Sequence, residues 1–568
     1  MDAGTRSWWG WGIVDQAVPD GECVQLAAAL EGLPDAPLRI PAVAELALSP
    51  PRIVAPTALA AIVSDSPEHR ASHTYGKAYR DVVRALDGDL ANAPDLVAFA
   101  RTEADVVAVL DWAGADDIAV VPFGGGSSVV GGVEYRGERP AVSLDLTGLN
   151  RVLEVDATSR AARIQAGALG PALEEQLHRH GVTLRHFPQS FEFSTLGVWL
   201  ATRAGGHYAT GPTHIDDFVE SMRVVTPAGA CESWRLPGCG AGPSPDRLFL
   251  GSEGALGVIT EAWMRVQDRP SHKASAAVTF ADFTAALAAV RAIAQSGLNP
   301  ANCRLLDPGE AAMSGSGDGA NSVLVLGLES ARFPVHEQLA QLVDLARQHG
   351  GAVAARKTGA VDAWRSAFLR MPYLRDGLAR MSAIVETFET ATTWDRLPGL
   401  IDAVRIDAAV AVQDVCGVSG MLNCRLTHAY PDGAAPYFTV VAPGRRGSEL
   451  AMWDEIKAAV SETSCDTGPP SRTTMASGAT TAPRTTSNVR TCSPPHYGRP
   501  SQLWTHSTSS IPGCSSIERR EFTSASMFLS SGRHRRIRVE QCHGTYHQLR
   551  LLPCSPDGYR HCSFEGLL

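Results

Sequence analysis

A run of three glycines directly after a buried apolar stretch constrains this 568-residue chain more than any other local feature. Residues 118–122 predict a buried strand, which leads into Pro122-Phe123-Gly124-Gly125-Gly126-Ser127-Ser128. Glycines at such a place let backbone N–H groups converge on an anion, so a diphosphate can be held without a positive side chain. Taken alone, the run is also what an ordinary turn would show, and it is neither GxGxxG nor a Walker loop.

The pattern on either side of this loop is typical of a protein with mixed helices and strands. Strands are expected at residues 95–100, 118–122, 141–145, 152–156, 161–165, 322–328 and 437–441, and helices at 103–116, 170–180, 280–295 and 336–349. The chain is too long for one hydrophobic core. We predict a docking segment at 1–88 that packs its tryptophans on the main domain, a first domain at 89–270, a second at 271–462 and a tail at 463–568.

Composition sets broad limits on function. The hydrophobic content of 44% and charged content of 19% are those of an ordinary soluble protein, and the net charge of −10 argues against a broad nucleic-acid surface. No apolar run reaches the roughly 18 residues of a membrane span, and residues 1–20 lack the apolar core of a secretory signal. The twelve cysteines form no CxxC pair, so we expect a reduced cytoplasmic location and no metal site.

The amino-acid composition of the sequence changes after Glu462. Residues 463–568 hold 30 Ser/Thr, 12 Arg, six acids and no Lys, and they carry half of the cysteines. No helical or strand periodicity lasts in this stretch, which favours disorder or a non-native sequence.

Reading the codons of the tail one base out of frame permits a series of short motifs in a regular order. When the last base of each codon joins the first two bases of the next, residues 472–476 yield nAC, nAC, nAT and GGC, which read His-His-His-Gly with C at the free positions. The same shift permits Leu-Asp-Pro at 504–506, Asn-Pro-Gly at 511–513 and a stop codon at the junction of 517 and 518. Free bases make many readings permissible, so coincidence is the alternative. We predict a frameshift, as though one base were missing near Thr463.

Three further blocks place the glycine loop in context. Pro188-Gln189-Ser190-Phe191-Glu192-Phe193-Ser194-Thr195-Leu196-Gly197 leads into Ala201-Thr202-Arg203-Ala204-Gly205-Gly206, and Gly251-Ser252-Glu253-Gly254-Ala255-Leu256-Gly257-Val258-Ile259 closes the unit. With the loop, these blocks resemble the vanillyl-alcohol oxidase / p-cresol methylhydroxylase superfamily, and the alkyldihydroxyacetonephosphate synthases in particular, from Trp8 to about Glu462. The resemblance implies an α+β fold, with a two-subdomain FAD-binding domain of p-cresol methylhydroxylase type at 89–270 and an α+β cap domain for the substrate at 271–462.

The resemblance also assigns each block to a part of the cofactor. The diphosphate would be wrapped by Pro122, Phe123, Gly124, Gly125, Gly126, Ser127 and Ser128. The isoalloxazine and ribityl chain would be lined by Gln189, Ser190, Phe191, Glu192, Phe193, Ser194, Thr195, Thr202, Arg203, Ala204 and Gly205, and the adenosine side by Glu253, Gly254, Ala255, Leu256, Gly257, Val258 and Ile259. Relatives that attach flavin covalently often place a His in the glycine loop. This loop has none, so non-covalent FAD is expected.

Three residues match reacting or binding groups of the family, and His207 is a further candidate from its position. Arg304 and Arg375 match family arginines, and a guanidinium fork suits phosphate or carboxylate; a structural salt bridge is the alternative for Arg304. Tyr437 matches the family's active-site tyrosine, whose phenol can pass a proton at a leaving carboxylate; a tyrosine in a core strand is the alternative. His207, after Gly205-Gly206, could reach the flavin edge or serve as a hydrogen-bonded structural residue.

The resemblance implies that the acyl group of an acyl-dihydroxyacetone phosphate is exchanged for a fatty alcohol in ether lipid synthesis, with a non-redox use of flavin. The family's histidine triplet, which moves a proton in this reaction, occurs only in the shifted frame. Two other functions stay open: an oxidoreductase acting on a D-2-hydroxy acid, and an inactive flavin-binding product of a damaged gene. The expected partners are a small-molecule or lipid substrate, a membrane surface contacted peripherally and, by analogy, a second copy of the chain, but no nucleic acid.

Overall fold

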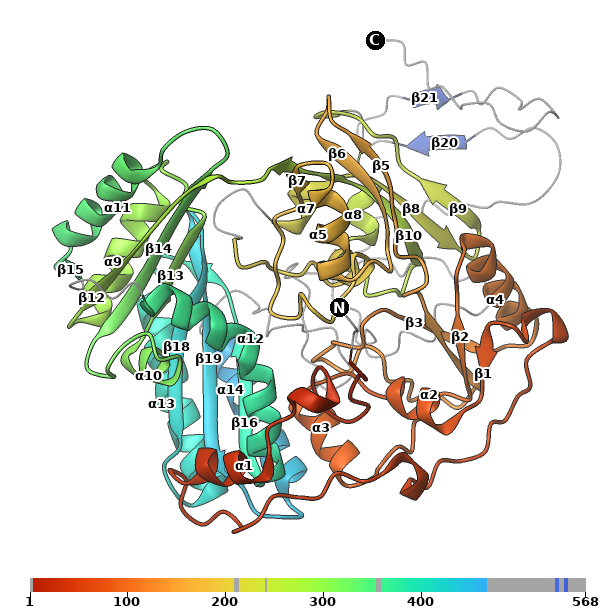
Figure 1. Cartoon of the computed structure of the whole chain (residues 1–568), viewed down its shortest axis with the longest axis horizontal. Helices are drawn as coiled ribbons and strands as arrows, with labels where there is room; N and C mark the ends of the chain where they lie inside the picture. Colours follow the sequence, from red (N-terminus) through yellow and green to blue (C-terminus); the bar gives the residue numbers. More distant parts are fainter. Residues whose placement is uncertain are drawn as a thin grey trace. The chain divides into compact units, whose positions relative to one another are not determined.

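The computed structural model describes the backbone of residues 4–208, 214–240, 243–353, 359–466, 537–540 and 546–549, and the side chains of 4–208, 214–240, 243–353 and 367–463. These residues belong to two compact units. The first unit holds everything up to residue 466, and Figure 1 shows its sheets with helices packed against them.

The first sheet carries the glycine loop. Its strands lie in the order β1 (Val63–Ser64), β2 (Leu96–Phe99), β4 (Ala141–Asp145) and β3 (Ala119–Phe123), with β2 and β3 both parallel to β4. Helix α4 (Glu103–Ala115) connects β2 to β3. It begins in a capping box, because the Thr102 hydroxyl accepts a hydrogen bond from the Asp105 amide at 3.2 Å and the Asp105 carboxylate accepts one from the Thr102 amide at 2.9 Å.

The second sheet is antiparallel and has its own core. Its order is β5 (Val152–Asp156), β6 (Ala161–Gln165), β10 (Val258–Arg265), β8 (Val219–Thr226) and β9 (Gly229–Glu232). The elements connected with it are α5 (Gly170–His178), α6 (Leu196–Thr202), α7 (Ile215–Phe218), α8 (Asp246–Phe249) and the strand pair β7 (Val182–Thr183) and β11 (Gln267–Asp268). Trp199 of α6, 1% exposed, is the largest side chain buried in this core.

The cap domain is built on a long antiparallel sheet. The strand order is β15 (Ala352–Val353), β12 (His272–Phe280), β14 (Ser322–Ser330), β13 (Asn302–Leu306), β18 (Met421–Ala429), β19 (Gly433–Pro443) and β16 (Ala383–Glu389), and β17 (Thr392–Thr393) also pairs with β19. Its helices are α9 (Phe283–Ala294), α10 (Pro308–Met313), α11 (His336–Gln348), α12 (Gly359–Arg380), α13 (Leu397–Cys416) and α14 (Glu449–Asp466).

The two faces of the cap sheet bury alternate residues of the same strands. Leu324 and Leu326 lie in the large core with α9, α11, α13 and α14, whereas Val323 and Val325 pack with Phe368 of α12 on the other face. This follows from the period of two in a strand, which sends successive side chains to opposite faces. Helix α12 therefore covers the face that does not carry α9 and α11 (Figure 1).

The N-terminal segment reaches both domains. It contains the turns η1 (Val14–Gln16), η2 (Val43–Glu45) and η3 (Thr57–Leu59) and the helices α1 (Asp20–Ala27), α2 (Pro67–Ser72) and α3 (Tyr79–Leu86). Trp9 lies in the cap core and Trp11 packs edge-on against Phe193 at 6.0 Å, as expected of a docking segment. The segment also does more than dock, because it supplies strand β1 to the first sheet and packs α3 against the cap helices α12 and α14.

The second unit contains the strand pair β20 (Ile537–Glu540) and β21 (Tyr546–Leu549), antiparallel from Ile537↔Leu549 to Glu540↔Tyr546. The sequence of the tail showed no lasting periodicity and favoured disorder, so this strand pair differs from the expectation. Helix α14 also continues to Asp466, past the predicted change at residue 463. The rest of the predicted tail lies outside the described residues, and the frameshift stays a prediction.

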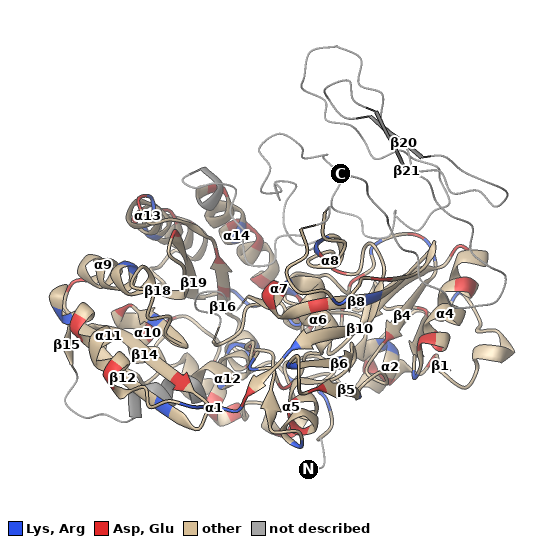
Figure 2. Cartoon of the chain, turned by 90° about the horizontal axis from the view of Figure 1, so that it is seen from above, with Lys and Arg blue, Asp and Glu red and all other residues tan. Residues whose placement is uncertain are grey.

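The expected strands and helices of residues 95–349 are confirmed, with ends that differ by at most three residues. The expected strand at 437–441 is the centre of the longer β19. Acidic and basic residues are interspersed along the described elements (Figure 2), so neither sign of charge is confined to one stretch of the fold.

Candidate functional site

The glycine loop, the first of the four predicted blocks, is in close contact with the second block, residues 188–197. A Cβ atom built on Gly125 would lie 1.6 Å from the carbonyl oxygen of Phe193, so only glycine allows this approach. On the other side, the Ser128 carbonyl accepts a hydrogen bond from the Lys77 amide at 2.5 Å, and a Cβ on Gly76 would lie 2.1 Å from the same oxygen. The loop is therefore held from two sides by backbone contacts.

The loop presents amide donors to whatever lies in front of it. Gly124, Gly125 and Gly126 are buried, and their N–H groups donate to no acceptor among the residues the structure describes. Buried backbone donors are almost always satisfied, so this group of amides is suited to an anionic ligand. Of all observations on the chain, this one fits a diphosphate best.

The four predicted blocks meet around the loop. Gly254 of the fourth block lies against Pro122, where a Cβ would be 3.2 Å from the proline Cγ. The Glu253 amide donates to the Ala201 carbonyl at 2.9 Å, which joins the fourth block to the third. Gln189 of the second block donates through its Nε2 to the Phe368 carbonyl of the cap at 2.8 Å. The structure thus brings together segments from residue 122 to residue 259.

Several predicted cofactor residues use their side chains for packing. Val258 and Ile259 lie in β10 with their side chains in two different cores, so only their backbone can face a cofactor. The guanidinium of Arg203 pairs with Asp216 at 2.6 Å. Ser194 accepts the indole N–H of Trp199 at 2.6 Å, which fixes the second block to α6.

A cluster in the cap contains two of the predicted reacting residues. Arg304 of β13 is 2% exposed, and Tyr437 of β19 pairs in register with Arg425 of the strand between them. The Arg425 guanidinium lies 4.0 Å above the Tyr437 ring and pairs with buried Glu310. Burial raises the pKa of Tyr437, and the cation of Arg425 opposes that rise.

Burial also acts on Arg304. Burial first, and the nearby charge of Arg425 after it, lower the pKa of Arg304 to about 9. Two buried guanidinium groups therefore face the same region, which favours the binding of an anion there.

His207 supports Arg304 by hydrogen bonding. Its carbonyl accepts from Arg304 Nη2 at 3.3 Å, its amide donates to the Phe187 carbonyl at 2.7 Å, and its Nε2 lies 3.0 Å from Asn302 Nδ2. These hydrogen bonds fit the structural histidine that was the alternative for this residue. Its reach to the flavin edge stays a prediction.

Arg375 lies in a separate group beside the N-terminal segment. Its guanidinium donates to Asp376 at 2.7 and 3.0 Å, and the other oxygen of Asp376 accepts the Trp11 amide at 2.5 Å. Buried Lys77 adds a cation here, and burial lowers its pKa to about 8, with the charge of Arg6 as the next cause. The N-terminal segment thus forms part of the surroundings of a predicted substrate residue.

Comparison with known proteins agrees with this geometry. The family described as FAD binding domain matches residues 94–233, and the family described as FAD linked oxidases, C-terminal domain, matches residues 269–464. The alkyldihydroxyacetonephosphate synthase of Dictyostelium discoideum is 32% identical over 415 residues, which cover 68% of this chain and 67% of that protein. The chain belongs to the alkyldihydroxyacetonephosphate synthase family.

Two solved structures show which fold this member of the alkyldihydroxyacetonephosphate synthase family has. A crystal structure of an alkyldihydroxyacetonephosphate synthase matches with a TM-score of 0.72 and 28% identity, covering 81% of this chain and 92% of that one. A p-cresol methylhydroxylase structure matches with a TM-score of 0.54 at 14% identity, which shows the fold alone. The predicted α+β fold and FAD as cofactor are confirmed.

The oxidoreductase alternative has a weaker relative. A D-lactate dehydrogenase of Arabidopsis thaliana is 30% identical over 218 residues, 38% of each chain. The similarity to the alkyldihydroxyacetonephosphate synthases is much longer, so it outweighs this match.

Sequence reasoning missed two residues of the segment 1–88 that contact the glycine loop and the strands beside it. Arg6 donates to the Gly125 carbonyl at 2.8 Å and lies 4.5 Å above the Phe193 ring. His73 contacts Asp145 at 3.1 Å and Phe123 at 4.2 Å between ring centroids. The available signal was His73-Thr74-Tyr75-Gly76-Lys77, a polar and aromatic run with a glycine just before a helix, in a segment treated only as a docking element.

Proposed function

We propose that this chain exchanges the acyl group of an acyl-dihydroxyacetone phosphate for a fatty alcohol. The observation that carries the proposal is the cluster of buried Arg304 and Arg425 with half-buried Tyr437 in the cap. It combines cations for an anionic substrate with a phenol for proton transfer. The family membership and the glycine loop supply the setting.

The residues of the FAD domain fit their cofactor. The amides of Gly124–Gly126 would hold the diphosphate, and the second and third blocks would supply a wall of small side chains and backbone beside the ring system. FAD, when bound, would supply the electron-poor isoalloxazine ring for the reaction.

The cap residues would then handle charge and protons. In the exchange, the bond from the reacting carbon to the carboxylate oxygen breaks with its electron pair, a bond to the alcohol oxygen forms, and the alcohol proton must be passed on. Tyr437 would move that proton while Arg425 above its ring steadies the phenolate. Arg375 would bind the phosphate, and Arg304 would counter the negative charge of the leaving carboxylate.

The histidine triplet of the family would complete proton transfer, and it occurs only in the shifted frame of the tail. We therefore propose that the chain as printed loads FAD but turns over slowly. Restoring one base near codon 463 should raise the exchange rate roughly 10²–10⁴-fold, the usual contribution of a positioned proton-transfer group.

The test compares the printed chain with the repaired chain, both loaded with FAD. Formation of the ether product from acyl-dihydroxyacetone phosphate and hexadecanol is followed by mass spectrometry. Equal rates for the two chains would contradict the role of the triplet, and a colourless repaired chain would contradict the FAD site. Bleaching of the flavin by D-lactate, with no ether product, would favour the D-2-hydroxy acid oxidoreductase, whose carboxylate substrate the fork of Arg375 also fits.

We also propose that the protein is cytoplasmic, binds its lipid substrates at a membrane surface and forms a homodimer. The buried free thiols of Cys23, Cys303 and Cys424 are compatible with a reducing compartment. None of the helices in the described part of the chain is long and apolar enough to cross a membrane.

A further inference from the structure

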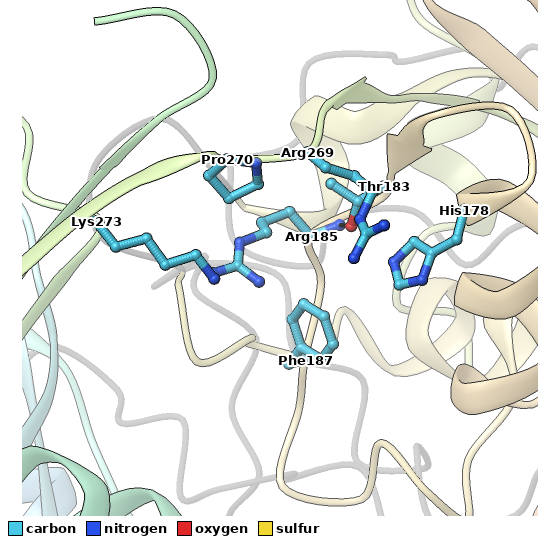
Figure 3. Close-up of a pocket in the computed structure, with 7 residues that line it drawn as sticks. All are labelled: His178, Thr183, Arg185, Phe187, Arg269, Pro270 and Lys273. Atoms are coloured by element: carbon cyan, nitrogen blue, oxygen red, sulfur yellow. Dashed lines mark hydrogen bonds between the residues drawn. The ribbon is translucent and has the colours of Figure 1, made fainter. Parts of the chain in front are cut away.

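A cationic cavity lies outside the FAD and cap clusters, at the point where the chain passes from the second sheet into the cap. It has a volume of about 130 Å³. Its lining residues are His178 of α5, Thr183 of β7, Arg185 and Phe187 after β7, Arg269 and Pro270 after β11, and Lys273 of β12. Figure 3 shows the Lys273 side chain extending toward the Arg185 guanidinium, with Arg269 beside Thr183 and His178 at the other end.

A buried carboxylate builds the turn that carries Arg185. Glu174 of α5, 5% exposed, accepts hydrogen bonds from the Thr183 hydroxyl at 2.7 Å and from the amides of Leu184 and Arg185 at 3.1 and 3.2 Å. Arg185 itself has a φ of +62°, a left-handed conformation that is unfavourable for any residue with a side chain. The fold thus fixes an arginine in a strained turn at the cavity wall.

Two neighbours orient the Arg185 guanidinium. It pairs with Glu329 of β14 on one side, and it lies 3.8 Å above the ring of Tyr208 on the other. Phe187 is also close, with its ring centroid 5.3 Å from the guanidinium carbon. An arginine held by an ion pair and an aromatic face loses little further freedom when it binds a ligand.

The cavity carries more positive than negative charge. Lys273 lies 3.8 Å from Glu329, which it shares with Arg185, and Arg269 has no carboxylate partner within the described part of the chain. The three cations therefore outnumber Glu329 and Glu174, the two carboxylates that contact the cavity residues. A surplus of positive charge in a concave site attracts anions.

The cavity is connected to the candidate substrate residues by direct contacts. Tyr208, beneath Arg185, packs edge-on against His207 at 4.9 Å, and the His207 carbonyl accepts from Arg304. A ligand anchored at Arg185 would thus lie a short distance from the buried cap cluster.

We propose that this cavity binds a phosphate monoester. Arg269 and Lys273 would bind the phosphate oxygens, and Arg185, held in a fixed orientation, would line the cavity beside them. Two sources share this chemistry: the substrate's own phosphate, held before it enters the cap cluster, and the headgroup of an anionic lipid such as phosphatidic acid. The first source rests on the proposed function, whereas the binding of phosphate itself does not.

The test titrates inorganic phosphate into the full-length, FAD-loaded chain and into the R269Q/K273Q variant by calorimetry. Both changed residues are exposed, so the fold should be kept, and the thermal midpoint checks this. We expect the variant to bind phosphate about tenfold or more weakly, since two charge-assisted contacts are removed. R347Q, which removes an exposed arginine of α11 paired with Asp344, serves as the matched control and should bind phosphate normally.

Undetectable phosphate binding by the unchanged chain, equal binding by the variant, or an equal loss in R347Q would overturn the proposal. With phosphate binding lost in the variant, two further measurements identify the source. A raised KM for acyl-dihydroxyacetone phosphate at unchanged kcat assigns the cavity to the substrate. Reduced co-sedimentation with phosphatidylcholine vesicles containing phosphatidic acid, at unchanged KM, assigns it to a lipid headgroup. Because the phosphate titration does not depend on turnover, its failure is distinguishable from failure of the proposed function.

Discussion

At the scale of single residues, the pair of Arg425 and Tyr437 explains how a half-buried phenol could take part in proton transfer. Burial alone would raise the pKa of Tyr437 and make its phenolate costly. The guanidinium 4.0 Å above the ring counters this effect, and buried Glu310 keeps the guanidinium in place. Arg425 is a positioning residue in this account, since it acts through Tyr437.

Replacing Tyr437 with Phe should lower the exchange rate of the frame-repaired chain roughly 10²–10⁴-fold, because the proton-transferring hydroxyl is removed. The flavin absorbance should be unchanged, since Tyr437 is in the cap and not in the glycine loop. Steady-state rates and an absorbance spectrum of Y437F check both expectations. Y430F, another change in the cap, is the control and should keep its rate; a fully active Y437F would exclude the phenol from the reaction.

At the scale of elements, the positions of most strands and helices were predictable from the sequence, and long-range contacts were not. The strand at 141–145 was predicted to the residue, because its apolar run is bounded by turns. Helix α12 was missed, since Pro372 lies inside it and reads as a break. Arg425 was missed as well, because only the register of β18 and β19 brings it to Tyr437.

The glycine loop gives the prediction that belongs to this scale. G125A should abolish flavin binding, because the added Cβ would lie 1.6 Å from the Phe193 carbonyl and the loop would have to move. G114A, in helix α4, meets nothing within 4 Å and should bind flavin normally, with a stability gain of up to about 1 kcal/mol. Flavin content after purification and thermal midpoints measure the two effects. Normal flavin content in G125A would place the diphosphate elsewhere.

At the scale of the whole molecule, one buried histidine sets a sensitivity to acid. His186 packs against Trp199 and Phe218, and its Nε2 has no hydrogen-bond partner among the described residues. Burial first, and then the charges of His214 and His428, lower its pKa to about 3. Between about pH 6.5 and pH 3 the unfolded chain binds a proton there that the folded chain does not, so stability falls as the pH falls.

At pH 5, about 1.5 pH units below the ordinary histidine pKa, this site should cost about 2 kcal/mol relative to pH 8. H186F removes the titrating group and keeps an aromatic ring, so its thermal midpoint should fall less than that of the unchanged chain between pH 8 and pH 5. Differential scanning calorimetry at the two pH values compares the proteins. Equal falls in both proteins would show that His186 does not contribute to acid sensitivity.

The path of the N-terminal segment has a consequence for how the chain acquires its fold on the ribosome. Trp9 shares a core with Trp453, and the Tyr79 hydroxyl donates to the Ala383 carbonyl at 2.9 Å. Trp9 and Tyr79 therefore leave the ribosome several hundred residues before the cap residues that they contact. Until the cap residues are made, these aromatic side chains lack their partners, and transiently exposed apolar surface of this kind promotes aggregation.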